Sequence, residues 1–321
     1  MQVIASAPAK AILFGEHAVV YGKPAIAMAL NKKAHVKVSD NSNNKIYVNV
    51  DKLKLSGYLD FKNNNILSDS PKKGILKYIL ASIKKVHDGS GLDIYIDLDI
   101  PIGGGLGSSA AVTVATIAAV SKYNNMDLKK EEIAKYSHEV ELEIQKAASP
   151  LDTTVSTYGG LIYLEKDAKD IVQLNVNQDI PVVIGYTNSR GNTGKLIEAV
   201  RIRKNSYPEI INPVIDSIET VTLNAKDAII TNDKKRIGEL MNINHGLLDA
   251  LGVNTKELSN MVYNARNAGA IGSKITGAGG GGSIIAYCPE GLEKVISVFK
   301  ETDRALKADI SKEGVKVTVS E

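Results

Sequence analysis

Residues 92–111 read LDIYIDLDIPIGGGLGSSAA, and this stretch decides which fold the chain can adopt. Apolar and polar residues alternate strictly from Leu92 to Ile100, which predicts a strand with one buried face. After the glycines, the stretch from Ala110 to Val120 is almost wholly apolar and predicts a helix buried on most sides. A strand, a glycine loop and a core helix therefore follow one another in this order.

The glycine loop is a candidate phosphate site. Glycines let the backbone wrap an anion closely, and the following helix offers unpaired amide groups at the positive end of its dipole. The two common nucleotide motifs do not match. Lys23 and Lys195 follow glycines, but proline and leucine come next instead of serine or threonine, and Ser108 stands where a dinucleotide fingerprint needs glycine. A tight strand-to-helix turn without a ligand is the alternative.

A second glycine segment, Gly277–Gly282, lies between expected strands at 271–276 and 283–287. Its six residues include five glycines, which is entropically costly for a simple hairpin, because two residues can close one. This composition indicates that something approaches the backbone closely. A flexible surface hairpin is the alternative.

The rest of the N-terminal half predicts strands and helices. Strand-forming residues between glycine and asparagine breaks predict strands at 3–7, 25–30, 35–39 and 45–50. Three- and four-residue apolar steps predict helices over 71–86 and 128–147, and the second stops at Ser149-Pro150. Residues 51–70 have the weakest pattern and are expected to form a loop or a small excursion.

The second half predicts a helix-rich region between strands. In chain order, we expect strands at 161–164 and 182–186, a helical region over 193–268 broken at Pro208, Pro213, Gly246 and Gly252, a helix over 292–306, and a closing strand at 315–320.

Composition bounds the class of protein. The chain has 321 residues, of which 44% are hydrophobic and 23% charged, as in ordinary globular proteins. Its net charge of +3 gives no general field for a nucleic acid or a membrane surface. Cys288 is the only cysteine, which excludes an internal disulfide and a cysteine-based zinc cluster. The start lacks a secretory pattern and no 18-residue apolar run occurs, so the cytoplasm is the expected location.

Three charged or polar residues interrupt apolar passages. Alone, Lys10 is ordinarily a solvated edge residue, His17 a hydrogen-bonded structural residue, and Asp152 a helix or turn cap. Lys10 and His17 occur together within residues 6–22, however, and this proximity makes the structural explanations weaker.

Four passages in this order resemble the GHMP kinase superfamily, and within it the archaeal-type mevalonate kinase family, over essentially the whole chain. They are Gly15–Gly22, 101–111, Ser149-Pro150-x-Asp152 with Val155-Ser156-Thr157, and Asn242-x-Asn244-His245-Gly246-Leu247-Leu248. Galactokinases are similar at Gly-Glu-His but continue differently, and homoserine kinases lack the run that follows it.

The resemblance implies a two-lobed α+β fold. The N-terminal lobe, residues 1–165, would resemble ribosomal protein S5 domain 2 and carry the ATP phosphate loop and the catalytic aspartate. The C-terminal lobe, residues 166–321, would be a ferredoxin-like arrangement of helices and sheet. The implied reaction is transfer of the γ-phosphoryl group of ATP to the C5 hydroxyl of (R)-mevalonate, giving 5-phosphomevalonate for isoprenoid synthesis.

The resemblance also implies roles for particular residues. Asp152 would accept or orient the hydroxyl proton, and Lys10 would keep Asp152 ionised and favour the developing alkoxide. Glu141 and Ser109 would bind Mg²⁺, with Glu139 and Glu143 as alternatives to Glu141. The ATP phosphates would contact Gly103, Gly104, Gly105, Leu106, Gly107, Ser108, Ser109 and Ala110. Mevalonate would contact Lys10, Glu16, His17, Asp152, Thr193, Gly277, Ala278 and Gly279.

Two departures from the family pattern bear on these roles. Ala9 replaces the usual glycine before Lys10, and a glycine that needs positive φ there would leave Lys10 displaced. Gly191 stands where animal enzymes usually carry arginine, which weakens the inference for Thr193.

Other classes of function stay open at this point. A related decarboxylase of diphosphomevalonate is opposed by the Gly-Glu-His run and by the position of Glu141. A silent ligand-sensing or RNA-binding member is opposed by the three charged groups and by the small net charge. The expected partner is the small molecule mevalonate, with no nucleic acid and no membrane, and the sequence leaves a homodimer open.

Overall fold

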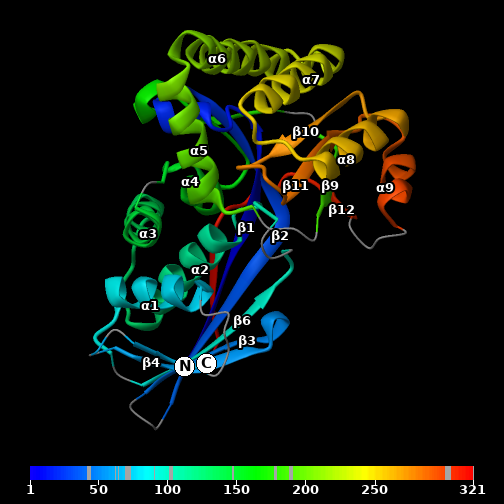
Figure 1. Cartoon of the computed structure of the whole chain (residues 1–321). Coiled ribbons are helices and arrows are strands. Elements are labelled where there is room, and N and C mark those ends of the chain that lie inside the picture. Colours follow the sequence, from blue (N-terminus) through cyan, green and yellow to red (C-terminus); the bar gives the residue numbers. More distant parts are fainter. Residues whose placement is uncertain are drawn as a thin grey trace.

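The computed structural model describes most of the chain as two β-sheets with helices packed on them, an α+β architecture (Figure 1). The described residues are 1–41, 45–61, 63, 65–68, 74–89, 91–100, 104–146, 148–176, 179–187, 191–300 and 305–320.

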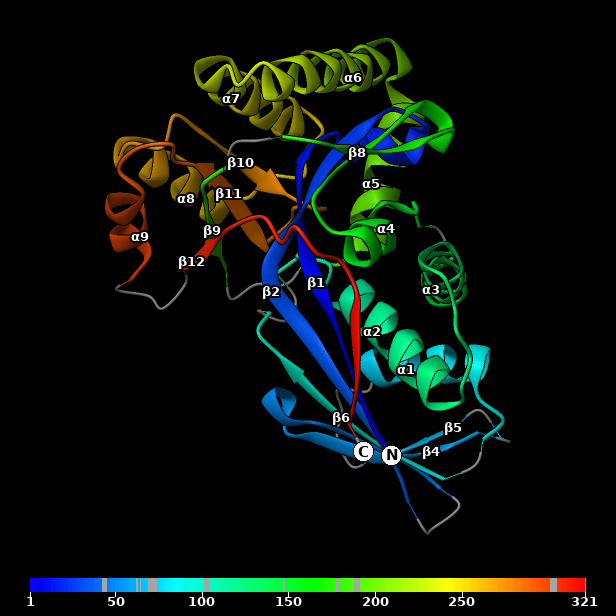
Figure 2. The same cartoon turned by 180° about the vertical axis from the view of Figure 1, so that it is seen from behind.

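Nine strands form the first sheet within these described residues. In spatial order its main path is β13 (Lys316–Ser320), β1 (Gln2–Phe14), β2 (Ala25–Asp40), β6 (Leu92–Leu98), β3 (Ile46–Val50), β4 (Leu55–Asp60) and β5 (Asn65–Leu67), while β7 (Leu161–Leu164) pairs with β2 and with β8 (Ile171–Leu174). The pairing of β3 with β6 is parallel. The long strands β1 and β2 run side by side toward the second sheet (Figures 1 and 2).

The described part of this half of the molecule has four α-helices, namely α1 (Gly74–Val86), α2 (Ser108–Tyr123), α3 (Lys130–Gln145) and α4 (Leu151–Tyr158). Helix α2 is central. It packs on β1 and β2 and against the other three helices, and every residue from Ala110 to Ser121 is buried. The small side chains of this stretch allow such close packing on all sides, so the prediction of a core helix is confirmed.

The second sheet has the order β10 (Gly272–Thr276), β11 (Ser283–Tyr287), β9 (Val182–Tyr186) and β12 (Ala305–Ala308), and its pairs are antiparallel. Its helices are α5 (Thr193–Ser206), α6 (Pro208–Ile230), α7 (Lys234–Ala250), α8 (Lys256–Asn267) and α9 (Leu292–Lys300), and short 3₁₀ turns occur at η1 (Ala18–Tyr21), η2 (Asp51–Leu53) and η3 (Lys166–Ala168). Helix α8 packs on β10 and β11, whereas α7 packs on α6 and on β10. None of the helices in the described part of the chain combines the length and apolar character that a membrane crossing requires.

Two strands from beyond residue 165 join the first sheet. Strand β8 pairs with β7, and β13 pairs with β1, which brings the two ends of the chain together (Figure 2). The division of the chain at residue 165 therefore stays a prediction about the lobes, since strands from beyond it complete the first sheet.

Residues 51–70 were expected to form a loop or a small excursion, and in the described part of this range the loop alternative was wrong, because β4 and β5 extend the sheet there. The buried positions Leu55, Gly57 and Leu59 alternate with more exposed neighbours, as in a half-buried strand. The alternation is hard to recognise in the sequence because one of its buried positions is a glycine, Gly57, rather than an apolar side chain. A Cβ at Gly57 would lie 2.7 Å from the carbonyl oxygen of Leu67, so the pairing of β4 with β5 leaves no room for one.

Two predicted helix breaks were also wrong. Pro213 lies inside α6, where it removes a single backbone donor, and Gly246 lies inside α7. The break occurs instead at Asn232, which has a φ of 55°, and at Asp233, whose side chain caps α7 by accepting from the amide of Arg236. The helix expected over 292–306 likewise ends at Lys300, and residues 305–308 form β12.

Candidate active site

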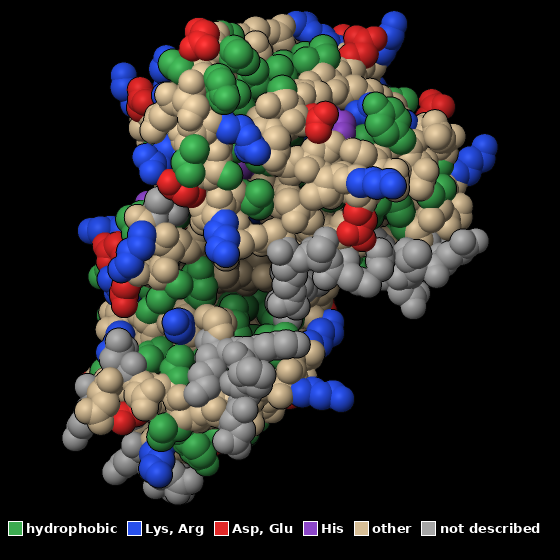
Figure 3. All heavy atoms as spheres, in the orientation of Figure 1, with side chains coloured by type: hydrophobic (Ala, Val, Ile, Leu, Met, Phe, Trp, Pro, Cys, Tyr) green, Lys and Arg blue, Asp and Glu red, His purple; other side chains and the backbone are tan. Residues whose placement is uncertain are grey.

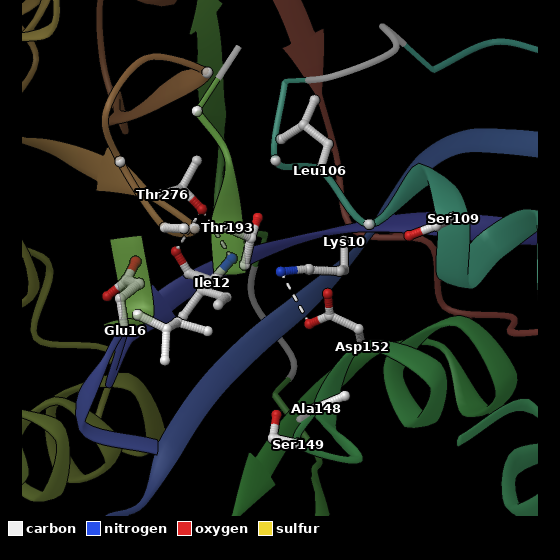
Figure 4. Close-up of a pocket in the computed structure, with 18 of the residues that line it drawn as sticks. Lys10, Ile12, Glu16, Leu106, Ser109, Ala148, Ser149, Asp152, Thr193 and Thr276 are labelled. Atoms are coloured by element: carbon white, nitrogen blue, oxygen red, sulfur yellow. Dashed lines mark hydrogen bonds and ion pairs between the residues drawn. The ribbon is translucent and has the colours of Figure 1, made fainter. Parts of the chain in front are cut away.

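A cavity of ≈ 270 Å³ lies between the two halves of the molecule, and four segments line it. They are the end of β1 with the turn after it, the first glycine loop, the junction of α3 and α4, and the second glycine segment together with the start of α5. Figure 4 shows side chains from these segments converging.

On the described residues of the face in Figure 3, basic and acidic side chains are interspersed rather than segregated.

The first glycine loop leads directly into α2. Gly107 adopts a φ of 68° and precedes the helix, whose first hydrogen bond runs from the amide of Ala111 to the carbonyl of Gly107. The amides of Ser108, Ser109 and Ala110 are therefore left without partners inside the helix. Gly104–Ser109 line the cavity and Ala110 is buried behind them, whereas Gly103 lies outside the described residues. The loop thus presents several amide donors to an anion.

Lys10 and Asp152 meet at the floor of the cavity. The Lys10 Nζ lies 2.9 Å from the Asp152 Oδ1, and the Lys10 side chain is 4% exposed (Figure 4). Lys10 comes from β1, and Asp152 from the first turn of α4, where the helix dipole favours a negative charge. Ala9 lies in β1 and has no positive φ, so the alanine in place of glycine does not displace Lys10.

Glu141 is a buried carboxylate on α3 beside this pair, with a residue exposure of 2%. Burial first, and then the neighbouring charge of Asp152, raise the pKa of Glu141 well above its usual range, while Lys10 opposes the shift. Glu139 pairs with Lys85 at 2.8 Å, and Glu143 is exposed. Of the three glutamates, all of them described, it is Glu141 that lines the cavity.

This carboxylate environment fits Mg²⁺. Glu141 and Asp152 place two carboxylates near one another with Lys10 beside them, and the Ser109 hydroxyl lines the same cavity. Mg²⁺ prefers oxygen donors of this kind and keeps several waters and phosphate oxygens as its other ligands. Burial and the charge of Asp152 disfavour ionised Glu141, and a divalent cation here would offset both effects.

His17 and the second glycine segment form the opposite wall. The His17 Nε2 lies 2.9 Å from the carbonyl oxygen of Ala278, and because a carbonyl only accepts, Nε2 carries the proton. Burial lowers the pKa of His17, although the bond to Ala278 opposes this effect. The Nδ1 of His17 is then an acceptor, and it is buried without a hydrogen-bond partner among the described residues.

Glu16 lines the cavity but its carboxylate is occupied by the protein itself. One oxygen pairs with Lys274, and the other accepts from the Nδ2 of Asn244 at 3.0 Å. The residue exposure of Glu16 is 1%. Glu16 was expected to contact the acceptor, and such a contact would have to replace one of these two bonds.

The two glycine segments touch each other. A Cβ on Gly277 would lie 3.2 Å from the carbonyl oxygen of Gly105, and one on Gly282 would lie 3.3 Å from that of Gly104. The first glycine loop is thus what approaches the backbone of the second segment, and the alternative of a flexible surface hairpin was wrong.

Thr193 and Gly191 lie at the start of α5. Thr193 is exposed and lines the cavity beside the second glycine segment. A Cβ on Gly191 would lie 2.1 Å from the carbonyl oxygen of Gly279, so this backbone accommodates no side chain at Gly191.

The sequence prediction missed several residues around the cavity. Thr276 lines the cavity, and its hydroxyl binds the backbone of Ile12 in both directions, at 3.0 Å each (Figure 4). Tyr78 on α1 shares hydrogen bonds with Ser109 and with Gln145, which also lines the cavity. Thr276 is the last residue of the strand expected at 271–276, and the strand pattern gave it no separate role. Tyr78 gave no local signal, since its partners Ser109 and Gln145 lie on two other helices, α2 and α3.

His245 on α7 gives a testable pH dependence of stability. Burial, followed by the charges of Arg266 and Lys274, lowers the pKa of His245 to about 4, and Asp249 opposes the shift. An unfolded histidine has a pKa of about 6.5, so as the pH falls the unfolded chain binds a proton at this residue before the folded chain does. Stability from neutral His245 is complete above about pH 6.5 and is lost as the pH falls toward 4.

We therefore expect His245→Gln to flatten the fall of the unfolding midpoint between pH 7 and pH 4.5, measured by thermal unfolding of both proteins in parallel. Other groups contribute equally to both curves, so the difference isolates His245. Parallel curves would contradict the assignment.

Comparison with known proteins supports this architecture. The family model "GHMP kinases N terminal domain" matches residues 73–160, and "GHMP kinases C terminal" matches residues 225–315. The mevalonate kinase of Methanothermobacter thermautotrophicus is 45% identical over 315 residues, covering 98% of this chain and 100% of that protein. The mevalonate kinase of Pyrococcus furiosus is 46% identical over 332 residues, covering 99% of this chain and 98% of that protein.

Among solved structures, the crystal structure of the Methanococcus jannaschii mevalonate kinase matches with a TM-score of 0.81 at 30% identity, covering 96% of this chain and 98% of that one. The expected two-lobed α+β kinase fold is confirmed by this match. With family models on both halves and relatives along nearly its whole length, the chain belongs to the GHMP kinase family, on the branch formed by the mevalonate kinases.

Proposed function

We propose that the chain transfers the γ-phosphoryl group of ATP to the C5 hydroxyl of (R)-mevalonate, giving 5-phosphomevalonate and ADP. The observation that carries the proposal is the Lys10–Asp152 pair, 2.9 Å apart, facing the amide-lined start of α2 across one cavity. The names of the nearly full-length relatives support the choice of acceptor. The reaction would take place in the cytoplasm between small molecules, without a nucleic acid or membrane partner.

Asp152 and Lys10 would act on the acceptor alcohol. Such a hydroxyl is about as weak an acid as water, with a pKa of roughly 16. Asp152 would accept or orient the hydroxyl proton, and the Lys10 ammonium would stabilise negative charge on the attacking oxygen. Since phosphoryl transfer passes through a loose transition state, placing this oxygen in line with the γ-phosphorus is as important as removing its proton.

The first glycine loop would hold the ATP phosphates. The free amides of Ser108, Ser109 and Ala110 lie at the positive end of α2, and the turn through Gly107 directs them toward the cavity. Glu141 and Ser109 would hold Mg²⁺, which supplies neutralisation of the phosphate charge when it is bound. Gly104 and Gly105 would let the triphosphate lie close to the backbone.

The acceptor would lie between Asp152 and the second glycine segment. The His17 Nδ1 is an acceptor without a protein partner among the described residues, so it can receive a hydroxyl hydrogen of mevalonate. The hydroxyl of Thr193 and the backbone of Gly277–Gly279 complete the wall.

An acceptor screen tests this proposal. ADP release is measured with ATP and Mg²⁺ in the presence of mevalonate, mevalonate 5-phosphate, homoserine or galactose. We expect turnover with mevalonate, and the absence of turnover above background would overturn the proposal. Release of carbon dioxide from the diphosphate of mevalonate would identify a decarboxylase instead.

The Mg²⁺ site is tested with Glu141→Gln. Ionised Glu141 is disfavoured in the folded state because its pKa is raised, so the unfolding free energy falls as the pH rises through that pKa. We expect Glu141→Gln to raise the unfolding temperature at pH 7 without Mg²⁺, and to weaken Mg²⁺-dependent binding of a non-hydrolysable ATP analogue by about tenfold or more.

The exposed neighbour on the same helix provides the control. Glu143→Gln should leave both calorimetric binding and the unfolding temperature close to those of the original protein, since Glu143 is exposed and does not line this cavity. Equal Mg²⁺ dependence in the Glu141 variant and the original protein would rule out this site.

A further inference from the structure

A buried ion pair at the cavity, between Glu16 and Lys274, is not among the groups to which the phosphoryl transfer above gives a role. The Lys274 Nζ pairs with the Glu16 Oε1 and also donates to the carbonyl of Ile275 at 2.6 Å. The side chains of Lys274 and Glu16 are 0% and 1% exposed. A buried lysine costs considerable desolvation energy and is retained where its partner is held in good geometry.

The passage Asn242-x-Asn244 on α7 holds this pair from two sides. Asn244 donates to the second oxygen of Glu16. The Asn242 side chain accepts from the amide of Ser273 at 3.0 Å and donates to the carbonyl of Ile271 at 3.1 Å. It therefore hydrogen-bonds to the backbone along β10, which is an edge strand of the second sheet. One asparagine therefore fixes the strand that carries Lys274, and the other fixes the carboxylate.

The same two chain segments are joined at two further points. Thr276 lies two residues beyond Lys274 on β10, and its hydroxyl bonds to both backbone groups of Ile12. The ring of His17, next to Glu16, bonds to the carbonyl of Ala278. Three side-chain contacts thus join residues 12–17 to residues 274–278, and both segments line the cavity.

We propose that Glu16 and Lys274, held by Asn244, are positioning residues that set His17 and the second glycine segment at the acceptor end of the cavity. A carboxylate whose two oxygens are taken by Lys274 and Asn244 has to break one of these bonds before it can bind an acceptor hydroxyl. The inference rests on the proposed function and gives Glu16 an indirect role in it.

A double-mutant cycle tests the proposal, using Glu16→Gln, Lys274→Met and the double variant. Removing one partner leaves a buried charge uncompensated, whereas removing both leaves none. We expect each single variant to lower kcat/KM for the acceptor about 100-fold, the loss that a small misplacement of reacting groups causes. The double variant should recover most of this loss, and the KM for ATP should change little throughout.

The recovery distinguishes positioning from direct contact. If Glu16 bound the acceptor itself, the double variant would stay as impaired as Glu16→Gln alone, and the proposal would be overturned. Lys23→Met is the matched control, because Lys23 also joins the two halves, through Asp216 and Glu219, but does not line the cavity. It should keep the original kcat and acceptor KM.

A milder variant covers the case in which a single charge variant does not fold. Asn244→Ala removes one hydrogen bond to Glu16 without stranding a charge, and it should still reduce kcat/KM for the acceptor in the original background. The effect should largely disappear in the double variant, and original kinetics in Asn244→Ala would overturn the proposal. The cycle is run with the acceptor that the original protein is found to phosphorylate. If that acceptor is not mevalonate, the proposed function fails, but the cycle still tests whether Glu16 and Lys274 are positioning residues.

Discussion

Asp152→Asn is expected to lower kcat by about three orders of magnitude while the affinity for ATP stays close to its original value. The amide keeps the size of the side chain but loses both the negative charge and the ability to take a proton, and a positioned acid or base contributes about 10²–10⁴-fold to a rate. The nucleotide phosphates are proposed to contact α2 and its loop, which lie outside this change. ADP release gives kcat, and calorimetric titration with an ATP analogue gives the affinity.

The loss has to be separated from unfolding. Lys10 is 3% exposed and loses its 2.9 Å ionic partner in this variant, so a lower unfolding temperature is also expected. Kinetics are therefore measured well below the unfolding temperature of the variant. Asp127→Asn, which alters an exposed pair with Lys122, is the control and should keep its turnover. Original turnover in Asp152→Asn would show that the carboxylate has no catalytic role.

Gly107→Ala is expected to lower kcat about 100-fold with little effect on the fold. The added Cβ would lie 2.7 Å from the Cγ of Lys10 and 3.2 Å from its Cε, so the lysine stem has to move away. A shift of about 1 Å in a reacting group can cost about 100-fold in rate. The φ of 68° adds strain of about 1–2 kcal/mol for a residue with a side chain. Steady-state kinetics with both substrates give the measurement.

Gly246→Ala is the matched glycine control. Gly246 is exposed inside α7, and a Cβ there would meet no atom within 4 Å. Alanine in a helix interior is favoured over glycine by about 0.5–1 kcal/mol, so the unfolding temperature should rise while kcat stays unchanged. A loss of activity in this control comparable to that of Gly107→Ala would show that the Gly107 effect does not depend on Lys10.

Local patterns predicted the elements whose signals are local. The alternation at 92–100, the apolar run at 110–120 and the strands at 161–164, 182–186 and 283–287 correspond closely to the observed elements. Strands β4 and β5 were missed because a glycine interrupts the alternation, and their contacts with each other explain that glycine.

The sequence pointed to the charged residues of the candidate site, but not to the hydrogen bonds and ion pairs that hold the surrounding segments together. The resemblance drew attention to Lys10, Asp152 and Glu141, and the structure brings these three together. The pair of Glu16 with Lys274 joins residues 258 positions apart, and neither residue carries a local signal of the other. Such contacts depend on how β10 and α7 dock against the end of β1, which no periodicity in the sequence encodes.

Strand β1 and the turn after it connect several walls of the cavity, which limits how the protein can be engineered. Its backbone at Lys10 bonds to Leu106, its backbone at Ile12 bonds to Thr276, and the turn after it carries Glu16 and His17. A one-residue insertion within this strand would reverse which side chains face inward and would disturb several walls at once. Substitutions that adapt the cavity to a different acceptor alcohol are therefore best confined to Thr193 and Ile197 on α5. This helix packs mainly on α6, so its side chains can be changed without disturbing β1.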